Sequence, residues 1–183
     1  MRCRNPGCAE RNGGVRADSK LKSERELREI VARLKSTGTK VVWTNGCFDI
    51  LHEGHVSCLE QARRFGDVLV VGLNSDSSVR RIKGPGRPVH TQQHRARAIS
   101  ALSCVDYALI FDDPTTVRLL EALKPDIYAK GGDYTIDTIN QEERRVVESY
   151  GGRIEILPEV KGVSTTRIIE RIRPTCSRSG NDN

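Results

Sequence analysis

Two histidines three positions apart lie in the segment 44–55, which reads T-N-G-C-F-D-I-L-H-E-G-H and runs from a short apolar stretch into a helical pattern. His52 and His55 are predicted on one side of a first helical turn, where free backbone N–H groups and the helix dipole favour a phosphate. Their imidazoles can donate hydrogen bonds to a polyphosphate. Gly54 and Gly46 remove side chains where the ligand must approach closely. The alternative is a pair of surface or helix-capping histidines.

A glycine- and proline-broken segment at 81–89, R-I-K-G-P-G-R-P-V, carries cations and is predicted to be a mobile basic loop. Lys83 offers a point charge to phosphate oxygens, and Arg87 can bind them bidentately. Either side chain could instead be a solvated surface group, and the same two interpretations apply to Arg95 on the following helix.

Hydroxyl side chains gather at Ser164, Thr165 and Thr166, just after Gly162 and at the start of a predicted helix. Hydroxyls at a helix start combine capping with phosphate binding. A plain N-cap would explain one of these hydroxyls but not the run of three. A further glycine turn, K-G-G-D-Y at 130–134, follows another apolar run.

The elements that must position these residues alternate between strand and helix. Apolar runs of strand length occur at 41–43, 68–73, 107–111, 127–129 and 154–157. Helical patterns are predicted from the capping box at 23–26 to Gly38, and at 54–65, 91–103, 114–123, 139–150 and 164–172. This alternation predicts one α/β domain with a Rossmann-like, doubly wound parallel sheet of five strands, whose ligands bind beyond the carboxyl ends of the strands.

The predicted domain covers residues 23–172, between flexible segments at 1–22 and 173–183. The first segment is basic and supplies four of the six net positive charges of the chain. It predicts at most nonspecific attraction to polyanions, because no aromatic and basic RNA-binding signature is present. The chain has no apolar stretch of about 18 residues and no signal-peptide pattern, so we expect a cytoplasmic protein without membrane contact.

Metal binding is not expected from the cysteines and the remaining histidines. Cys47, Cys58 and Cys104 fall in or beside predicted core elements and are interpreted as reduced packing residues. Cys3 and Cys8 have the spacing of half a zinc site, without a second pair. His90 and His94 have the spacing of a zinc pair but lack the intervening glutamate of that motif, which favours a helix surface.

From Lys40 to Ile172 the sequence resembles the cytidylyltransferase-like nucleotidyltransferases. The resemblance rests on the H-x-G-H element and on G-V-S-T-T-R at 162–167. It implies a Rossmann-like fold, histidines that stabilise the transition state at the α-phosphate, and a late helix that holds the terminal phosphates. K-G-G-D-Y, N-S-D, R-P-V and S-T-T-R-I-I are most similar to the heptose 1-phosphate adenylyltransferases. His90 departs from that family, which commonly has asparagine there.

The resemblance implies transfer of AMP from ATP to a heptose 1-phosphate, with Mg²⁺ brought by the triphosphate. His52, His55 and Lys83 are the expected catalytic residues. The expected nucleotide-binding residues are Asn45, Gly46, Cys47, Phe48, Gly54, Arg87, Gly132, Asp133, Ser164, Thr165 and Thr166. A homodimer is expected from the family. Many of its members are fused to a sugar kinase, for which this sequence lacks the length, so a separate upstream sugar kinase is expected to supply the sugar 1-phosphate. The rivals are a CTP-dependent enzyme acting on an alcohol phosphate such as glycerol 3-phosphate, a nonenzymatic nucleotide-binding regulator, and a nucleic-acid-binding protein.

Overall fold

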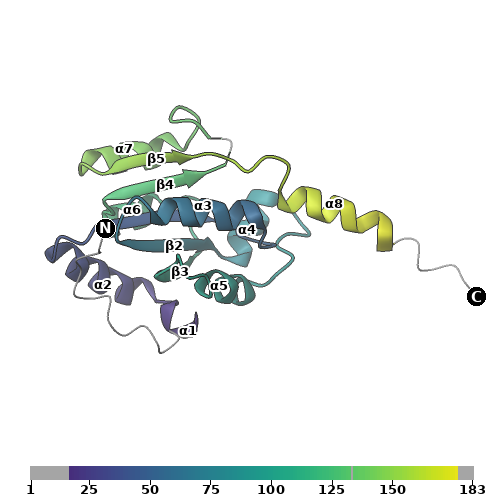
Figure 1. The fold of residues 1–183 in the computed structure, drawn as a ribbon, viewed down its shortest axis with the longest axis horizontal. Coiled ribbons are helices and arrows are strands. Elements are labelled where there is room, and N and C mark those ends of the chain that lie inside the picture. The colour runs from purple at the N-terminus through teal and green to yellow at the C-terminus, as the bar shows by residue number, and fades with distance from the viewer. Residues whose placement is uncertain (1–16, 133, 177–183) are drawn as a thin grey trace, which may run out of the picture.

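The computed structural model describes residues 17–132 and 134–176, and its centre is a five-stranded sheet (Figure 1). The strands are β1 (Val41–Gly46), β2 (Val68–Asn74), β3 (Tyr107–Phe111), β4 (Ile127–Gly131) and β5 (Arg153–Leu157). All neighbouring strands pair in parallel, in the order β3-β2-β1-β4-β5. The five predicted strands and the doubly wound sheet are therefore confirmed.

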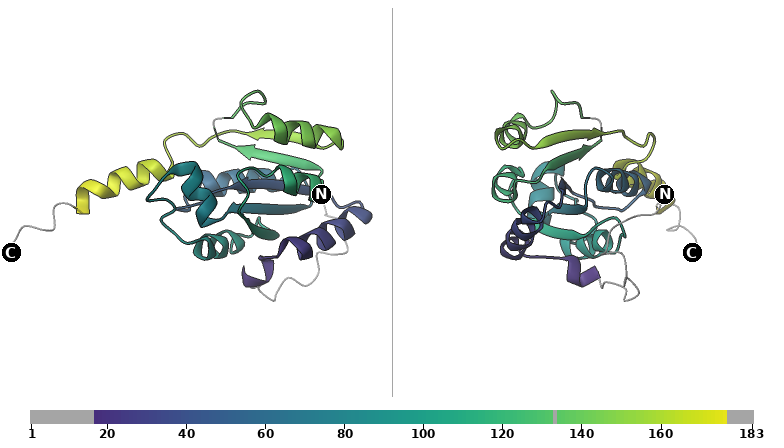
Figure 2. Two further views of the ribbon diagram at one scale, coloured as in Figure 1. Left: turned by 180° about the vertical axis from the view of Figure 1, so that it is seen from behind. Right: turned by 60° about the vertical axis from the view of Figure 1, so that its left-hand side comes forward.

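Helices cover both faces of the sheet, as the right-hand view of Figure 2 shows. The helices are α1 (Ala17–Lys20), α2 (Glu24–Ser36), α3 (Glu53–Arg63), α4 (Asp76–Lys83), α5 (Gln92–Ser100), α6 (Val117–Leu123), α7 (Gln141–Ser149) and α8 (Thr165–Cys176). Side chains of α3 and α5 join one buried cluster with Val42 of β1, whereas those of α2, α6 and α7 join another with Trp43. Successive residues of a strand thus serve opposite cores, which explains the unbroken apolar runs at the start of β1 and in β2.

The strand order creates the place where a ligand can bind. From β1 the chain winds outward through β2 and β3, and it then crosses to β4 and β5 on the other side of β1. The loops after β1 and β4 consequently leave the sheet in opposite directions and open a crevice at the carboxyl ends of these strands. Both glycine-containing loops singled out in the sequence follow these two strands.

The ordered unit begins earlier than the predicted boundary at residue 23. Lys20 Nζ donates to the carbonyl oxygens of Leu102 and Val105 at 2.9 and 2.7 Å, and the Lys22 amide donates to Ala108 O at 2.9 Å. Residues 17–22 are thus attached to β3 and to the end of α5, which corrects their assignment to a flexible segment. Residues 1–16 and 177–183, including Cys3 and Cys8, lie outside the described part of the chain.

Two helices differ from the sequence prediction. Residues 76–83 form α4, capped by Ser75, so Arg81, Ile82 and Lys83 end a helix and do not belong to the predicted loop, which begins at Gly84. Helix α8 continues to Cys176, past the predicted end at residue 172, and points away from the body of the protein (Figure 1). The capping box that starts α2 is confirmed, with Ser23 and Glu26 bonding each other's backbone amides.

Candidate active site

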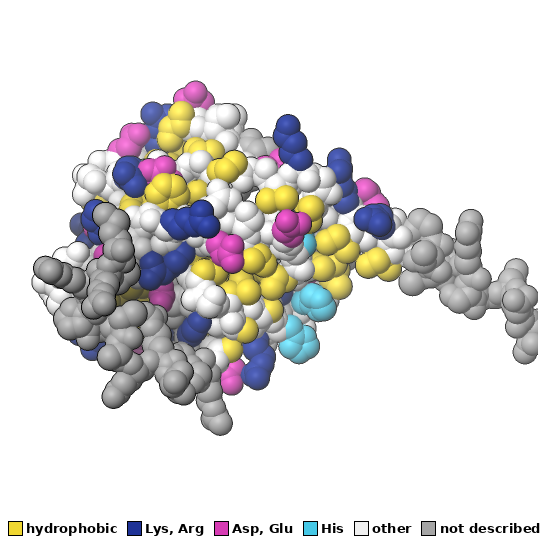
Figure 3. Space-filling model, in the orientation of Figure 1, with side chains coloured by type: hydrophobic (Ala, Val, Ile, Leu, Met, Phe, Trp, Pro, Cys, Tyr) yellow, Lys and Arg dark blue, Asp and Glu magenta, His cyan; other side chains and the backbone are white. Residues whose placement is uncertain are grey.

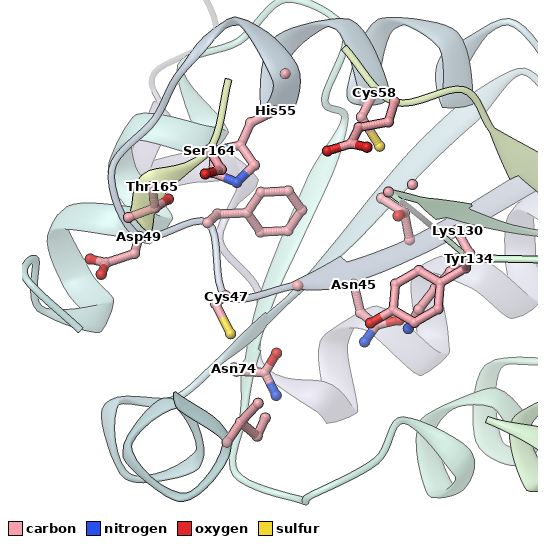
Figure 4. A pocket seen from close by; sticks show the side chains of 18 of the residues that line it. Asn45, Cys47, Asp49, His55, Cys58, Asn74, Lys130, Tyr134, Ser164 and Thr165 are labelled. Carbon is pink, nitrogen blue, oxygen red and sulfur yellow. The ribbon is translucent and has the colours of Figure 1, made fainter. Parts of the chain in front are cut away.

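A cavity of about 560 Å³ lies at the carboxyl ends of the strands, a size typical of small-molecule sites. Every predicted site residue that the structure describes lines it, and Asp133 lies outside the described residues. Figure 4 shows His55, Ser164 and Thr165 toward one end of the cavity and Asn45, Lys130 and Tyr134 toward the other. The lining residues predicted from sequence are Asn45, Gly46, Cys47, Phe48, His52, Gly54, His55, Lys83, Arg87, Gly132, Ser164, Thr165 and Thr166.

The two histidines of the H-x-G-H element stack on each other at the start of α3. Their ring centroids are 3.8 Å apart and their planes differ by 20°. His52 occupies the N-cap position with an extended backbone but makes no side-chain capping bond, which contradicts the helix-capping alternative. A Cβ on Gly54 would come within 3.1 Å of the His52 ring, so the glycine makes room for the imidazole itself.

Burial sets the protonation state of this pair. It lowers the pKa of His52, and burial together with the neighbouring His52 lowers the pKa of His55 to about 4. Both rings are therefore neutral at pH 7, and each carries one N–H and one lone pair. Within the described part of the chain, Nδ1 of His52 is buried without a hydrogen-bond partner. A stacked neutral pair of this kind can donate to phosphate oxygens without first giving up an ion-pair partner.

The loop between β1 and α3 is held by Arg95, whose side chain is fully buried. Its guanidinium donates to Cys47 O at 2.5 Å, to His90 O at 3.1 Å and to Asp76 Oδ1 at 2.8 Å. These bonds join the β1 loop, the start of α4 and the start of α5. Arg95 is thus neither a solvated surface group nor a phosphate-facing cation, and both sequence interpretations of it are corrected.

Asp49 is a site residue that the sequence analysis missed. Its buried carboxylate accepts hydrogen bonds from Arg87 Nε at 2.7 Å and from the amides of Val89 and His90 at 2.8 and 3.0 Å. Burial acts to raise the pKa of Asp49, but these donors outweigh it and hold the pKa below its usual value. The carboxylate therefore fixes the Gly84–His90 segment over the cavity. Its position directly after Phe48, in a loop expected to bind phosphate, was the available signal, because an acid there requires a cationic partner.

The basic residues of the cavity differ in their exposure and in their pairing with other side chains. Lys83 is exposed at the end of α4 and reaches the cavity from there. Arg87 also lines the cavity, and its Nε is paired with Asp49. The hydroxyl of Ser164 accepts from the Arg167 amide at 3.3 Å, as an N-cap does, while Thr165 and Thr166 also line the cavity. The N-cap alternative therefore accounts for Ser164 alone.

A second polar group lies at the β4 end of the cavity, where Asn45 was a predicted site residue but Tyr128, Lys130 and Glu143 were not. Lys130 Nζ donates to Tyr128 Oη at 2.9 Å, and Tyr128 Oη lies 2.7 Å from Glu143 Oε2 and 3.0 Å from Asn45 Oδ1. The Lys130 ammonium is 5.4 Å from the centre of the Tyr134 ring. Lys130 and Glu143 are 3.7 Å apart and nearly buried. Their pairing joins β4 to α7 across 13 residues, which local patterns in the sequence do not reveal.

The structure gives no support for a protein-held metal. Among residues 17–132 and 134–176, no cluster of three or more His, Cys, Asp or Glu side chains is placed to hold an ion. The helix-surface interpretation of both histidines is confirmed for His94, which is exposed on α5, whereas His90 is exposed in the loop before that helix. Cys47, Cys58 and Cys104 are free. Burial raises the pKa of all three thiols, so they stay protonated at neutral pH.

Two observations on the described residues concern membranes and polyanions. No described helix has both the length and the apolar character that crossing a bilayer requires. On the face shown in Figure 3, basic and acidic side chains are interspersed and do not form a continuous basic stripe.

Comparisons with known proteins agree on one family. The family model described as cytidylyltransferase-like matches residues 43–171. The Bifunctional protein HldE of Syntrophotalea carbinolica is 53% identical over 155 residues, which are 85% of this chain and 31% of the relative. The Bifunctional protein HldE of Geobacter sulfurreducens is also 53% identical over 155 residues, with the same coverage. The chain thus spans about a third of the length of these curated relatives.

Solved structures confirm the fold. The lipopolysaccharide core biosynthesis protein from Thermoplasma volcanium is 29% identical, with a TM-score of 0.56, and the match covers 69% of this chain and 100% of the other. A pantoate–β-alanine ligase from Francisella tularensis, solved with a β,γ-ATP compound and β-alanine, has the same TM-score at 14% identity and covers 89% of this chain and 81% of its own. At that identity the second likeness concerns the fold alone.

Proposed function

Because the chain belongs to the cytidylyltransferase-like family, we propose that it transfers AMP from ATP to a heptose 1-phosphate and releases pyrophosphate. The observation that carries the proposal is the meeting of the stacked His52–His55 pair with the Ser164–Thr166 hydroxyls in one cavity. Three features support the heptose acceptor. These are the K-G-G-D-Y resemblance, the identity of about half to the HldE proteins, and the match to a lipopolysaccharide core biosynthesis protein.

In the proposed reaction, a phosphate oxygen of the sugar 1-phosphate attacks the α-phosphorus of ATP in line with the bond to the β-phosphate oxygen. The new O–P bond forms as that bond breaks, and pyrophosphate leaves with its electron pair. The protein supplies position and charge stabilisation in such a transfer and forms no covalent bond. The N–H groups of His52 and His55 are assigned to oxygens of the α- and β-phosphates, where charge accumulates in the transition state.

The remaining residues hold the rest of the triphosphate. Ser164 to Thr166 and the first amides of α8 are assigned to the terminal phosphates, because a helix start offers free donors and a positive dipole. The backbone amides of Gly46, Cys47 and Phe48 complete the cradle. Lys83 and the terminal nitrogens of Arg87 bind phosphate oxygens, while the bond from Arg87 Nε to Asp49 fixes the guanidinium plane.

Further parts of the proposal rest on the family resemblance. Mg²⁺ would come with the triphosphate and would neutralise part of the phosphate charge, with no protein side chain assigned to hold it. The enzyme acts in the cytoplasm as a homodimer, and a sugar kinase activity provides the heptose 1-phosphate.

Pyrophosphate release tests the proposal over a matrix of donors and acceptors. We expect ATP with heptose 1-phosphate to give the highest kcat/KM. The rival is CTP with glycerol 3-phosphate, and a base pocket built for one ring edge leaves polar groups unpaired with the other. A higher kcat/KM for the CTP pair would refute the heptose assignment and leave the phosphate chemistry intact.

A further inference from the structure

Glu143 is a buried acid whose neighbours define a direction of hydrogen bonding. Its side chain is 4% exposed, Oε1 accepts from the Thr116 amide at 3.0 Å, and Oε2 lies 2.7 Å from Tyr128 Oη and 3.7 Å from Lys130 Nζ. All three neighbours present a hydrogen or a positive charge. Glu143 therefore acts as an acceptor toward each of them.

The single hydrogen of the Tyr128 hydroxyl decides the direction of the remaining bonds. Burial, followed by the neighbouring Glu143, raises the pKa of Tyr128 well above its usual value, so the hydroxyl keeps this hydrogen. Glu143 Oε2 at 2.7 Å is a closer and more basic acceptor than Asn45 Oδ1 at 3.0 Å. Once the hydrogen points to Glu143, the tyrosine oxygen can only accept, and it already accepts from Lys130 at 2.9 Å.

Asn45 must then present its amide nitrogen to Tyr128. If its amide oxygen faced the tyrosine oxygen, no hydrogen would lie between the two atoms and they would repel each other. A half-turn of the amide exchanges Oδ1 and Nδ2 within the same volume. In that orientation Tyr128 Oη makes one donated and two accepted bonds. The amide oxygen of Asn45, which lines the cavity, then faces the ligand.

We propose that Glu143, acting through Tyr128, is a positioning residue that turns the Asn45 amide so that its oxygen accepts a hydrogen bond from a sugar hydroxyl of a substrate. The inference rests on the proposed function, because both substrates of that reaction carry such hydroxyls. An amide oxygen cannot bind a phosphate oxygen, since neither atom carries a hydrogen. This end of the cavity thus favours a hydrogen-bond donor over a phosphate oxygen, and we assign that donor to a hydroxyl of either the ribose of ATP or the acceptor sugar, beside the Lys130 ammonium.

The direction of bonding makes the most conservative substitution the most harmful. In Glu143→Gln, the fixed Thr116 amide keeps an acceptor oxygen opposite it, so the new amide nitrogen must face Tyr128. The tyrosine then accepts from the glutamine and from Lys130, and its hydrogen turns to Asn45 Oδ1. Asn45 consequently presents its nitrogen to the cavity, and the bound hydroxyl must turn its own hydrogen away and accept from that nitrogen. In Tyr128→Phe the relay is absent, and Asn45 can turn either way.

Steady-state kinetics of purified full-length variants test whether Glu143→Gln is more harmful than Tyr128→Phe. For Glu143→Gln we expect kcat/KM to fall about tenfold or more for the substrate whose hydroxyl meets Asn45, because the hydrogen of that hydroxyl loses its acceptor in a desolvated site. A smaller fall is expected for Tyr128→Phe. Varying ATP and heptose 1-phosphate separately identifies the source, since the KM of only that substrate rises. Thermal unfolding confirms that each variant is folded.

Matched controls separate positioning from general damage. Tyr150→Phe removes another buried hydroxyl, one without a hydrogen-bond partner among the described residues, and Glu148→Gln changes an exposed acid of the same helix. Neither should change either KM. If Glu143→Gln were as mild as Tyr128→Phe, or raised both KM values equally, the proposal would be wrong.

A spectroscopic measurement on the free protein keeps the inference independent of the substrate assignment. The side-chain NH₂ resonances of Asn45, assigned by their loss in Asn45→Asp, report the bond to Tyr128. They should shift in Tyr128→Phe and in Glu143→Gln, and stay in place in Tyr150→Phe. Unmoved resonances in Tyr128→Phe would overturn the inference, whereas shifted resonances in a protein inactive toward heptose 1-phosphate would count only against the proposed function.

Discussion

Acid should destabilise this protein through His55, and the effect can be calculated from the state of the ring. Burial and the stacked His52 lower the pKa of His55 from the usual 6.5 to about 4. Above pH 6.5 the ring is neutral in both the folded and the unfolded chain. Below pH 6.5, the ring is protonated in the unfolded chain but stays neutral in the folded chain. The free energy of unfolding therefore falls until the folded ring is also protonated near pH 4. The full loss is about 3 kcal/mol, at about 1.4 kcal/mol per pH unit.

Urea denaturation at pH 7.5 and pH 4.5 measures this loss. Other groups also titrate in the interval, so the informative quantity is the difference between wild type and His55→Gln, which keeps a polar side chain that does not titrate. We expect the wild type to lose about 2 to 3 kcal/mol more than His55→Gln over this range. His94→Gln, at an exposed position on α5, is the control and should behave as wild type. Equal losses in wild type and His55→Gln would refute the account of a buried neutral pair.

Three further substitutions test other parts of the account. His55→Ala should lower kcat by about two orders of magnitude or more, because the imidazole N–H stabilises mainly the transition state. ATP binding, measured by calorimetry, should persist. Unchanged turnover in folded protein would contradict this role. Asp49→Asn removes the carboxylate that pairs with Arg87, so it should lower the free energy of unfolding by about 2 to 4 kcal/mol and raise the KM for ATP. Wild-type values for both quantities would show that the pair does not hold the loop. Gly72→Ala should cost about 1 to 3 kcal/mol in urea denaturation, because its Cβ would come within 2.5 Å of the buried Trp43 ring; a neutral effect would mean that the core yields there.

The sequence allowed the fold and the convergence of the site to be predicted, because both depend on local patterns. Apolar runs of strand length mark β1 to β5, and parallel strands bring their following loops to one edge. The H-x-G-H element and the Ser164–Thr166 run were therefore expected in one place, although they lie more than 100 residues apart in the chain.

The features that the sequence did not reveal depend on long-range pairing. Asp49 meets Arg87 38 residues later, and Glu143 meets the Thr116 amide 27 residues earlier, without any periodic signal for either contact. Helix α4 escaped notice because S-S-V-R-R-I-K has few apolar residues and runs directly into Gly84 and Pro85. Residues 17–22 are held by hydrogen bonds to backbone carbonyls. Such bonds do not require a pattern of apolar residues, so the sequence does not indicate them.

Transfer of labelled phosphorus from ATP tests the central proposal most directly. Wild-type protein is incubated with heptose 1-phosphate and Mg²⁺, with either [α-³²P]ATP or [γ-³²P]ATP, and the products are separated. The account predicts that the α-label appears in a sugar nucleotide and the γ-label in pyrophosphate. A γ-label in the sugar product, or transfer of the nucleotide from CTP but not from ATP, would contradict it.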